Sequence, residues 1–391
     1  MQRHDTDADT GTGADADTGS STDADTDADT DSSTDRPEIR RLLERAVTGG
    51  GIPGILVELH DGPHRWRATA GAADTATGRV RTPQDRFRVG SITKTFTATV
   101  VLQLAAEGRI GLDDQVTDQL PLPEAELAAG VTVRMLLDHT SGVPSHTDDP
   151  AALDRYATHP PGTLLEIAAA RPRTFAPGTG WAYSNTNYVL AGLLVERATG
   201  RTLAAEIDRR ISRPLGLTGT RLPAAGEHGL PAPHARHYTR LFRTDPGAPV
   251  LDATELDPAP FWASGDLVST AADLNRFLAA LLTGRLLPPA QQRQLLTTVP
   301  TRDWLPGAAY GLGICALTPP GGTEPLWGMG GATFGSWTYA FATADGTRRL
   351  TVNTNGDWTD PASGWDDPIG VFTDLLALAL PRERPAVRPE P

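Results

Sequence analysis

The chain has 391 residues, enough for one large domain or two ordinary ones, and its formal net charge at pH 7 is −13. Residues 1–35 hold eleven Asp and one Arg, so most of this charge lies in the first tenth of the chain and the remaining body is nearly balanced. A balanced body gives no reason to expect a nucleic acid or an anionic membrane surface as a partner. The single cysteine, Cys315, excludes an internal disulfide.

Residues 1–36 are predicted to be a disordered acidic tail, because they contain no large apolar residue after Met1 and cannot bury a core. The Asp spacing lacks the glycine and the distal glutamate of a calcium-binding loop. No basic segment followed by an apolar stretch opens the chain, and no apolar run reaches the length of a membrane-spanning helix. We therefore expect a cytoplasmic protein without metal or cofactor.

The first elements are predicted to be a helix, a hairpin and a second helix. Apolar residues at helical spacing favour a helix over 38–47, which ends at three consecutive glycines. Residues 54–60 are typical of a strand, Asp61-Gly62 of a turn, and 65–70 of the returning strand. A long helix is predicted over 92–107, and its nearly all-round apolar surface indicates that it is buried.

The middle of the chain, residues 110–265, is predicted to be mainly helical, and the last third returns to strands. Cys315 falls in one of these strands and is interpreted as a small buried hydrophobic residue. In chain order, the expected elements are helices over 164–170, 188–197 and 204–211, strands over 310–315, 337–344 and 349–355, and a closing helix over 369–380.

This order predicts an α+β fold, in which an antiparallel sheet is flanked by the N- and C-terminal helices and a helical region is inserted between its halves. We expect one catalytic domain over residues 37–384. Its sheet part would comprise 37–90 and 266–384, and its helical part 91–265. Residues 385–391 are expected to form a disordered C-terminus.

Lys94 is the only lysine among 35 Lys and Arg residues. Codon bias could leave a lone lysine by chance, but lysine can release its proton near neutral pH and arginine cannot. Lys94 follows Ser91 by three positions, so both side chains lie on one face of the predicted helix. The helix dipole would favour an anion at Ser91 and a neutral Lys94. This pattern indicates Ser91 as a nucleophile and Lys94 as its base.

The S-x-x-K motif of Ser91 and Lys94 is followed by a Y-x-N motif, Tyr183 and Asn185. Both motifs fall within five ordered segments, residues 87–94, 135–142, 183–188, 310–313 and 337–342. In these segments the chain resembles the serine β-lactamases and penicillin-binding proteins. The resemblance is greatest to class C β-lactamases and soluble D-alanyl-D-alanine carboxypeptidases, covers about residues 37–380, and implies a β-lactamase/transpeptidase-like fold.

The resemblance also implies a role for each matched residue. Ser91 would attack a carbonyl group and form an acyl-enzyme. Lys94 or Tyr183 would accept its proton, the tyrosine only if Lys94 lowered its pKa, and Tyr183 would protonate the leaving group. Asn185 would hold Lys94 and the substrate amide. The backbone N–H groups of Ser91 and Ala332 would form the oxyanion hole.

The third motif departs from the family pattern. The family has Lys or His, then usually a hydroxyl residue and Gly, where this chain has the expected substrate-binding residues Met329, Gly330 and Gly331. An arginine that the carboxypeptidases tend to carry is also absent from residues 314–317. Because charge-assisted contacts to a carboxylate are costly to lose, we predict an acyl donor that is an ester or neutral amide, small or peptidic.

These features predict a hydrolase or transacylase, such as those of natural-product pathways, with water, an amine or an alcohol as acceptor. Two alternatives stay open: a D-alanyl-D-alanine carboxypeptidase or β-lactamase-type peptidase, and a non-catalytic relative that binds a ligand. Met329 favours the non-catalytic alternative, and the intact Ser91, Lys94 and Tyr183 oppose it.

The histidines suggest no further chemistry. His139 is interpreted as a structural hydrogen-bonding residue. His234 and His237 are three positions apart but lack a Cys or acidic residue at ligand spacing, so we interpret them as surface residues and expect no metal site. The chain has no Gly-x-Ser-x-Gly motif, which disfavours an α/β-hydrolase.

Overall fold

The structure, a computed structural model, describes residues 30–31, 35–120, 125–154, 159–243, 245, 247–257 and 260–380. The predicted disordered C-terminus and most of the predicted acidic tail lie outside these residues. Within the tail, β1 (Thr30–Asp31) pairs in parallel with the start of β3 (His64–Asp74). Backbone pairing of this kind at a sheet edge needs no apolar side chain.

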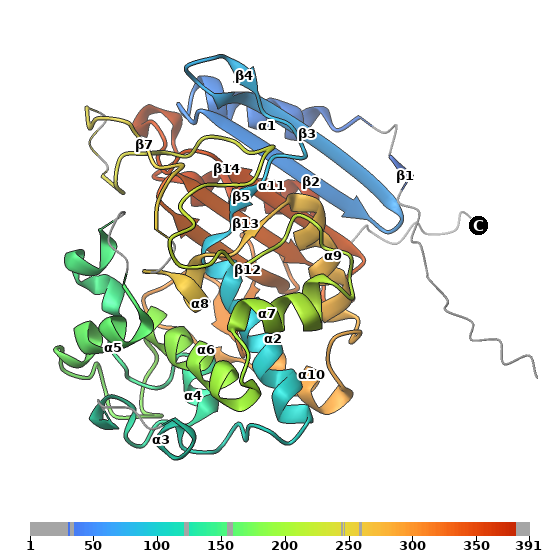
Figure 1. Cartoon of the computed structure of the whole chain (residues 1–391). Helices are drawn as coiled ribbons and strands as arrows, with labels where there is room; N and C mark the ends of the chain where they lie inside the picture. Colours follow the sequence, from blue (N-terminus) through green and yellow to red (C-terminus); the bar gives the residue numbers. More distant parts are fainter. Residues whose placement is uncertain are drawn as a thin grey trace, which may run out of the picture.

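A ten-stranded sheet runs in the order β1-β3-β2-β14-β13-β12-β11-β10-β9, with β4 beside β3 (Figure 1). Every pairing apart from that of β1 with β3 is antiparallel. Because β2 pairs with β14, the N-terminal hairpin and the C-terminal strands share one sheet, as predicted. The remaining strands of this sheet are β2 (Gly54–Asp61), β4 (Arg79–Val80), β9 (Val299–Pro300), β10 (Ala308–Tyr310), β11 (Cys315–Leu317), β12 (Leu326–Thr333), β13 (Ser336–Ala342) and β14 (Arg348–Thr354). Two separate two-stranded sheets pair β5 (Phe87–Arg88) with β8 (Val268–Ser269) and β6 (Tyr238–Thr239) with β7 (Leu251–Asp252).

Helices from both ends of the chain lie against one face of the sheet, and α9 (Ala271–Leu282) lies against the other (Figure 1). α1 (Pro37–Thr48) buries the apolar stripe that predicted it, and α11 (Pro368–Ala379) packs beside it. On that face the Tyr339 ring lies 5.0 Å from the Phe372 ring. The predicted arrangement of flanking helices is therefore present.

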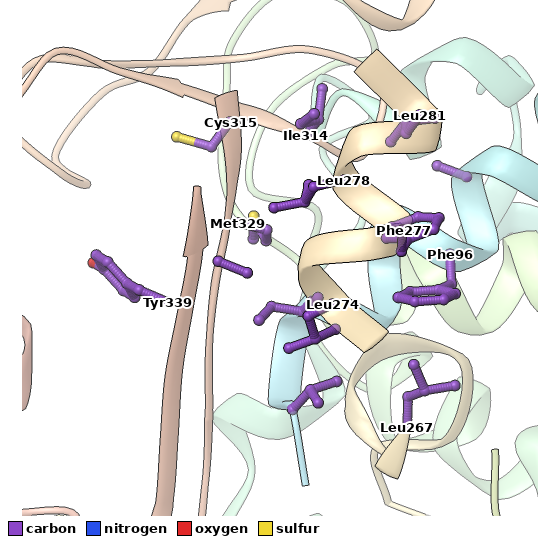
Figure 2. Packing of buried hydrophobic residues seen from close by; sticks show 14 of the residues in the cluster. Phe96, Leu267, Leu274, Phe277, Leu278, Leu281, Ile314, Cys315, Met329 and Tyr339 are labelled. Carbon is purple, nitrogen blue, oxygen red and sulfur yellow. The ribbon is translucent and has the colours of Figure 1, made fainter. Parts of the chain in front are cut away.

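The inserted region is helical, and α2 (Thr93–Ala106) runs through its centre, buried on nearly all sides as predicted. Phe96 of α2 stacks on Phe277 of α9 at 3.7 Å, which joins the helical region to the sheet (Figure 2). No described helix is both long and apolar enough to cross a membrane. The other helices are α3 (Val116–Gln119), α4 (Val133–Leu137), α5 (Pro161–Ala169), α6 (Asn185–Thr199), α7 (Leu203–Ile207), α8 (Trp262–Gly265) and α10 (Pro289–Leu295).

The single strand predicted over 310–315 is wrong. The structure has two short strands here, β10 and β11, which pair antiparallel around a turn. Gly313 in this turn has φ of +81°, a conformation that favours glycine, and its carbonyl accepts a hydrogen bond from Thr95 Oγ1 at 2.7 Å. Cys315 is buried at the start of β11, as expected.

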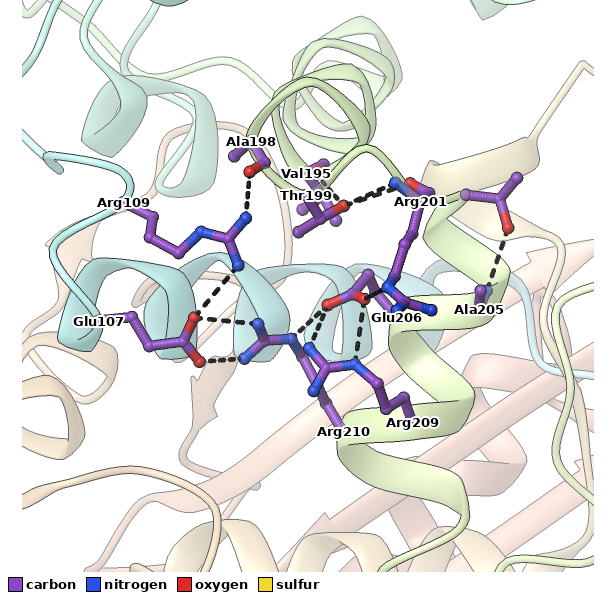
Figure 3. A network of polar contacts seen from close by, with 11 residues as sticks. Glu107, Arg109, Val195, Ala198, Thr199, Arg201, Ala205, Glu206, Arg209 and Arg210 are labelled. Atoms are coloured by element: carbon purple, nitrogen blue, oxygen red, sulfur yellow. Dashed lines mark hydrogen bonds and ion pairs between the residues drawn. The ribbon is translucent and has the colours of Figure 1, made fainter.

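A network of ion pairs fixes the end of α2 to α7 (Figure 3). The Glu206 carboxylate is fully buried and accepts hydrogen bonds from Arg209 at 2.8 Å and from Arg210 at 2.5 Å. Arg210 also donates to Glu107 at 2.5 Å. Removing Glu206 would leave the nearly buried Arg210 without one of its two carboxylate partners.

We expect Glu206→Ala to lower the free energy of unfolding by about 3 kcal/mol, the usual cost of breaking a buried ion pair. Chemical denaturation would measure it. The control is Glu227→Ala, which breaks an exposed pair with Arg221 and should cost less than about 1 kcal/mol. Equal losses in the two variants would contradict this account of the network.

Candidate active site

Ser91 lies where the helical region meets the edge of β12. A single 3-10 turn, Gly90–Ile92, leads into α2. Thr93 Oγ1 donates to the Gly90 carbonyl at 2.7 Å and accepts from the Leu267 N–H at 3.0 Å. These hydrogen bonds hold the turn so that the half-buried Ser91 side chain lines a cavity.

Lys94 is fully buried, and its Nζ has three oxygen neighbours. It lies 3.0 Å from Ser91 Oγ, 2.6 Å from Asn185 Oδ1 and 2.7 Å from the Ser264 carbonyl oxygen. Burial lowers the pKa of Lys94 well below that of an ordinary lysine. A neutral amine fits these neighbours, because two N–H groups can donate to the amide and carbonyl oxygens while the lone pair faces the Ser91 hydroxyl.

The Tyr183 ring lies beside this amine, with Lys94 Nζ 4.8 Å from the ring centroid. Its other neighbours include the rings of His139 at 4.4 Å and Trp304 at 5.9 Å. Burial raises the pKa of Tyr183, and the nearby Ser91 hydroxyl opposes this without cancelling it. Lys94 does not lower the pKa of Tyr183 below its usual value, as one interpretation of the sequence required. Burial therefore favours a protonated Tyr183 and a neutral Lys94, and both side chains approach Ser91.

Asn185 joins Lys94 to the 3-10 turn His146–Asp148 and to Ser145 just before it. Its Oδ1 accepts from Lys94, and its Nδ2 donates to Thr147 Oγ1 at 2.8 Å. The Asn185 backbone N–H also donates to Ser145 Oγ at 3.1 Å. Asn185 is thus not a helix cap: Ser184 holds the cap position, and the Asn185 amide orients the lysine.

Glycines bring the two expected oxyanion-hole amides together. A Cβ atom added to Gly90 would overlap the backbone nitrogen of Ala332, and one added to Gly331 would lie 2.6 Å from the nitrogen of Ser91. Gly90 also has φ of +56°. The backbones of the Ser91 turn and β12 therefore approach more closely than residues with side chains would permit.

The cavity beside Ser91 has a volume of about 200 Å³ and apolar walls. No charged side chain lines it among the described residues. Burial raises the pKa of the Cys315 thiol, also in the wall, to about 12, so this group stays neutral. The aromatic and aliphatic part of the wall comprises Trp304, Leu305, Trp337, Tyr339, Phe341 and Ile369.

The three residues of the altered third motif do not contribute equally to this cavity. Met329 is only 2% exposed, and its side chain lies in the core on the α9 side of β12, opposite Tyr339 and Cys315 (Figure 2). Gly330 and Gly331 contribute backbone. A Cβ atom at Gly330 would lie 2.9 Å from the Tyr339 ring carbon Cδ1, so the tyrosine occupies the space of the family's hydroxyl side chain.

His139 is buried, as a structural role would require. Its Nδ1 accepts from the Ser184 N–H at 3.1 Å, and burial lowers its pKa well below that of an ordinary histidine. The interpretation of His237 as a surface residue is wrong, because it is fully buried. Over the part of the chain that the structure describes, no three His, Cys, Asp or Glu residues form a group that could hold a metal.

Several residues of the site could not be found from the sequence. Ser264 in α8 and Thr147 in the 3-10 turn His146–Asp148 contribute oxygen atoms next to Lys94 and Asn185 from distant parts of the chain. Tyr339 and Trp337 line the cavity from β13. Tyr339 belongs to a segment that the family resemblance included, but nothing in its local sequence indicates that it fills the space beside Gly330.

The family model Beta-lactamase matches residues 39–366, and the chain belongs to this family. The solved structure of a D-stereospecific amidohydrolase from Streptomyces sp. is 40% identical, with a TM-score of 0.76 over 84% of this chain and 97% of that one. The D-amino acid amidase of Ochrobactrum anthropi SV3, complexed with L-phenylalanine amide, is 27% identical, with a TM-score of 0.77 over 88% and 97% of the two chains. The expected family and β-lactamase/transpeptidase-like fold are confirmed.

Among curated proteins, esterase EstB of Burkholderia gladioli is 37% identical over 190 residues, 45% of this chain and 47% of that protein. The matched stretch thus spans about half the length of this relative. Relatives of the chain therefore include proteins named as an esterase, an amidohydrolase and an amidase.

Proposed function

We propose that the protein is a serine hydrolase that forms an acyl-enzyme on Ser91 from uncharged amides or esters. The observation that carries the proposal is the 3.0 Å contact between Ser91 Oγ and the buried Lys94 Nζ, beside a cavity lined by no charged side chain within the described residues. The similarity to an amidohydrolase, an amidase and an esterase supports it.

The reaction follows from these positions. As Ser91 Oγ bonds to the carbonyl carbon, its proton passes to the neutral amine of Lys94. The N–H groups of Ser91 and Ala332 stabilise the oxyanion. The bond to the leaving group then breaks, and the proton reaches the leaving group through the protonated Tyr183 hydroxyl, which Lys94 resupplies. Water repeats the sequence to release the acid.

The cavity walls select the acyl group. Trp304, Trp337 and Phe341 favour an aromatic or aliphatic side chain, because burial of apolar surface drives binding. A carboxylate next to the scissile bond would meet no cation here, since Met329 lies in the core and Tyr339 fills the space beside Gly330. This argument disfavours the peptidase alternative.

Substrates matched in their acyl group test the proposal. N-acetyl-phenylalanine would be offered, in D and L forms, as its amide, its methyl ester and its peptide with alanine, whose free carboxylate lies next to the scissile bond. We expect the amide or ester to be turned over with kcat/KM at least about tenfold above the peptide, given the usual worth of a charge-assisted contact. Preference for the peptide would favour the peptidase alternative. Binding without turnover of any of them would favour the non-catalytic one.

Transfer to an amine or alcohol uses the same acyl-enzyme and extends the proposal. Adding such an acceptor to the assay would divert the acyl group from the acid to a new amide or ester. Product analysis by mass spectrometry separates the two outcomes, and formation of the acid alone would identify a hydrolase.

The pH dependence should identify the base. We expect kcat/KM for a non-ionising ester to rise with pH and to level off below pH 10.5, because protonated Lys94 cannot accept a proton and burial lowers its pKa from 10.5. If a Tyr183 phenolate were the base, the rate would still rise above pH 10, because burial raises that pKa from 10.0. Stopped-flow rates from mildly acidic to strongly basic pH distinguish the two.

The oxyanion hole can be tested at Gly331. We expect Gly331→Ala to lower kcat roughly 100-fold or more, because the added methyl group would separate the Ser91 turn from β12. The matched control is Gly162→Ala in α5, where an added Cβ would meet no atom within 4 Å. Near-normal kcat in Gly331→Ala would show that these two amides do not bind the oxyanion.

A further inference from the structure

A second cavity, of about 490 Å³, adjoins the one beside Ser91. Trp337 lines both cavities. The start of α11 also borders both, with Ile369 in the first and Asp366 and Asp367 in the second. A substrate that extends past Trp337 would therefore enter the second cavity.

Arg240 places a guanidinium in this second cavity. The group lies over the Trp358 ring, with its Cζ atom 4.8 Å from the ring centroid, which is a cation–π contact. The Arg240 side chain is half-buried, and its Nε atom is buried without a hydrogen-bond partner. No carboxylate of the described residues forms an ion pair with the Arg240 guanidinium. A partly buried cation without an anion is an unusual feature, since such charges are normally paired.

The two shielded carboxylates of the cavity are already engaged. Asp357 accepts hydrogen bonds from the Thr239 hydroxyl, from the Arg240 backbone N–H at 3.0 Å and from the Gly335 backbone N–H at 3.1 Å. Asp367 caps α11 by accepting from its backbone at 2.7 Å. Both carboxylates hold backbone in place, and neither forms an ion pair with the Arg240 guanidinium.

The remaining charges, Arg243 and Asp366, are exposed. They offset each other, so a ligand inside the cavity would meet the cation of Arg240 together with the hydrogen-bonded carboxylates of Asp357 and Asp367. A planar carboxylate matches the fork of a guanidinium, and its single negative charge is repelled less by the aspartates of the cavity than the double charge of a phosphate dianion would be.

The turn that carries Arg240 is strained. Leu241 and Phe242 have φ of +55° and +59°, and non-glycine residues seldom adopt this conformation. The Phe242 ring lies 6.4 Å from the Trp337 ring, so the turn stands beside the boundary between the two cavities. Strain of this kind persists where the surrounding structure imposes it, often at ligand sites.

We propose that the second cavity is a subsite in which Arg240 binds a carboxylate carried by the acyl part of the substrate, remote from the scissile bond. The proposal rests on the proposed function. The leaving group must face Lys94 and Tyr183, which supply its proton, whereas Trp337 is paired with Ala332, the expected oxyanion-hole residue, across β12 and β13. The acyl part is therefore the part that reaches Trp337.

The test uses p-nitrophenyl monoesters of dicarboxylic acids, from adipic to dodecanedioic acid, beside the same compounds with the remote carboxylate as a methyl ester. At one chain length or more, we expect kcat/KM for the acid to exceed that for its methyl ester by about tenfold, the usual worth of one charge-assisted pair. Arg240→Gln should remove this preference, and Arg240→Lys should keep part of it. Arg285→Gln, an exposed arginine before α10, should keep all of it.

The outcomes separate the two proposals. Methyl esters that are turned over, with no preference for the acid at any length, would overturn the subsite and leave the proposed function standing. The same holds if Arg240→Gln keeps the preference. A series with a remote phosphonate that reacted faster than the carboxylates would overturn the choice of ligand. If the wild-type protein turned over none of these esters, the proposed function itself would be overturned.

Discussion

Ser91→Ala is expected to lower kcat/KM for a neutral ester by about 10,000-fold or more and to abolish labelling by a fluorophosphonate probe. The substitution removes the oxygen atom that forms the acyl-enzyme. The oxyanion amides and the apolar cavity would remain, but they can only orient the substrate. Steady-state kinetics and intact-protein mass measure the two effects.

Ser212→Ala is the control for this variant, because Ser212 is a buried serine in the turn after α7 and does not line the cavity beside Ser91. Its kinetics should match those of the wild type. If Ser91→Ala kept more than a tenth of the wild-type rate, Ser91 would not be the nucleophile.

Lys94→Arg is expected to lower kcat/KM by roughly 1,000-fold, the worth of a positioned general base. Arginine stays protonated near physiological pH, so it cannot accept the Ser91 proton. The bulkier guanidinium would also have to fit among three oxygen atoms that lie 2.6 to 3.0 Å from Nζ. The measurement is kcat/KM across the pH range.

Asn185→Ala is a milder variant with which to compare Lys94→Arg. It removes one hydrogen-bond acceptor of the lysine and leaves the amine in place. A smaller loss than in Lys94→Arg is expected. If Lys94→Arg stayed within tenfold of the wild type and kept its pH profile, Lys94 would not be the base and Tyr183 would take that role.

The parts of the site that lie close together in the sequence were predictable. Ser91 and Lys94 are one helical turn apart, so the periodicity of α2 alone places them on one face. The β13–β14 hairpin and the helix-first, helix-last order likewise follow from local patterns and define the sheet. Tyr183 and Asn185 required the family resemblance, because nothing local connects them with Lys94, about ninety residues earlier in the chain.

The parts of the site that depend on strand register were not predictable. Gly330 lies directly opposite Tyr339 in the β12–β13 pairing, and only this register shows that a ring fills the space of a missing side chain. The burial of Met329 depends on the same register, because successive side chains of β12 point to opposite faces of the sheet and that of Met329 points to the face covered by α9. Arg240 reaches its cavity from an irregular turn whose position depends on hydrogen bonds to Asp357, more than a hundred residues away in the chain.

The most direct test of the account compares two acyl donors that share a phenylacetyl group, p-nitrophenyl phenylacetate and benzylpenicillin, by intact mass of the wild-type protein at short reaction times. The ester is neutral, and the penicillin carries a carboxylate next to its scissile bond. We predict a phenylacetyl adduct that maps to Ser91 and little or no penicilloyl adduct. No adduct from the ester, or a penicilloyl adduct that forms at least as fast, would contradict the account.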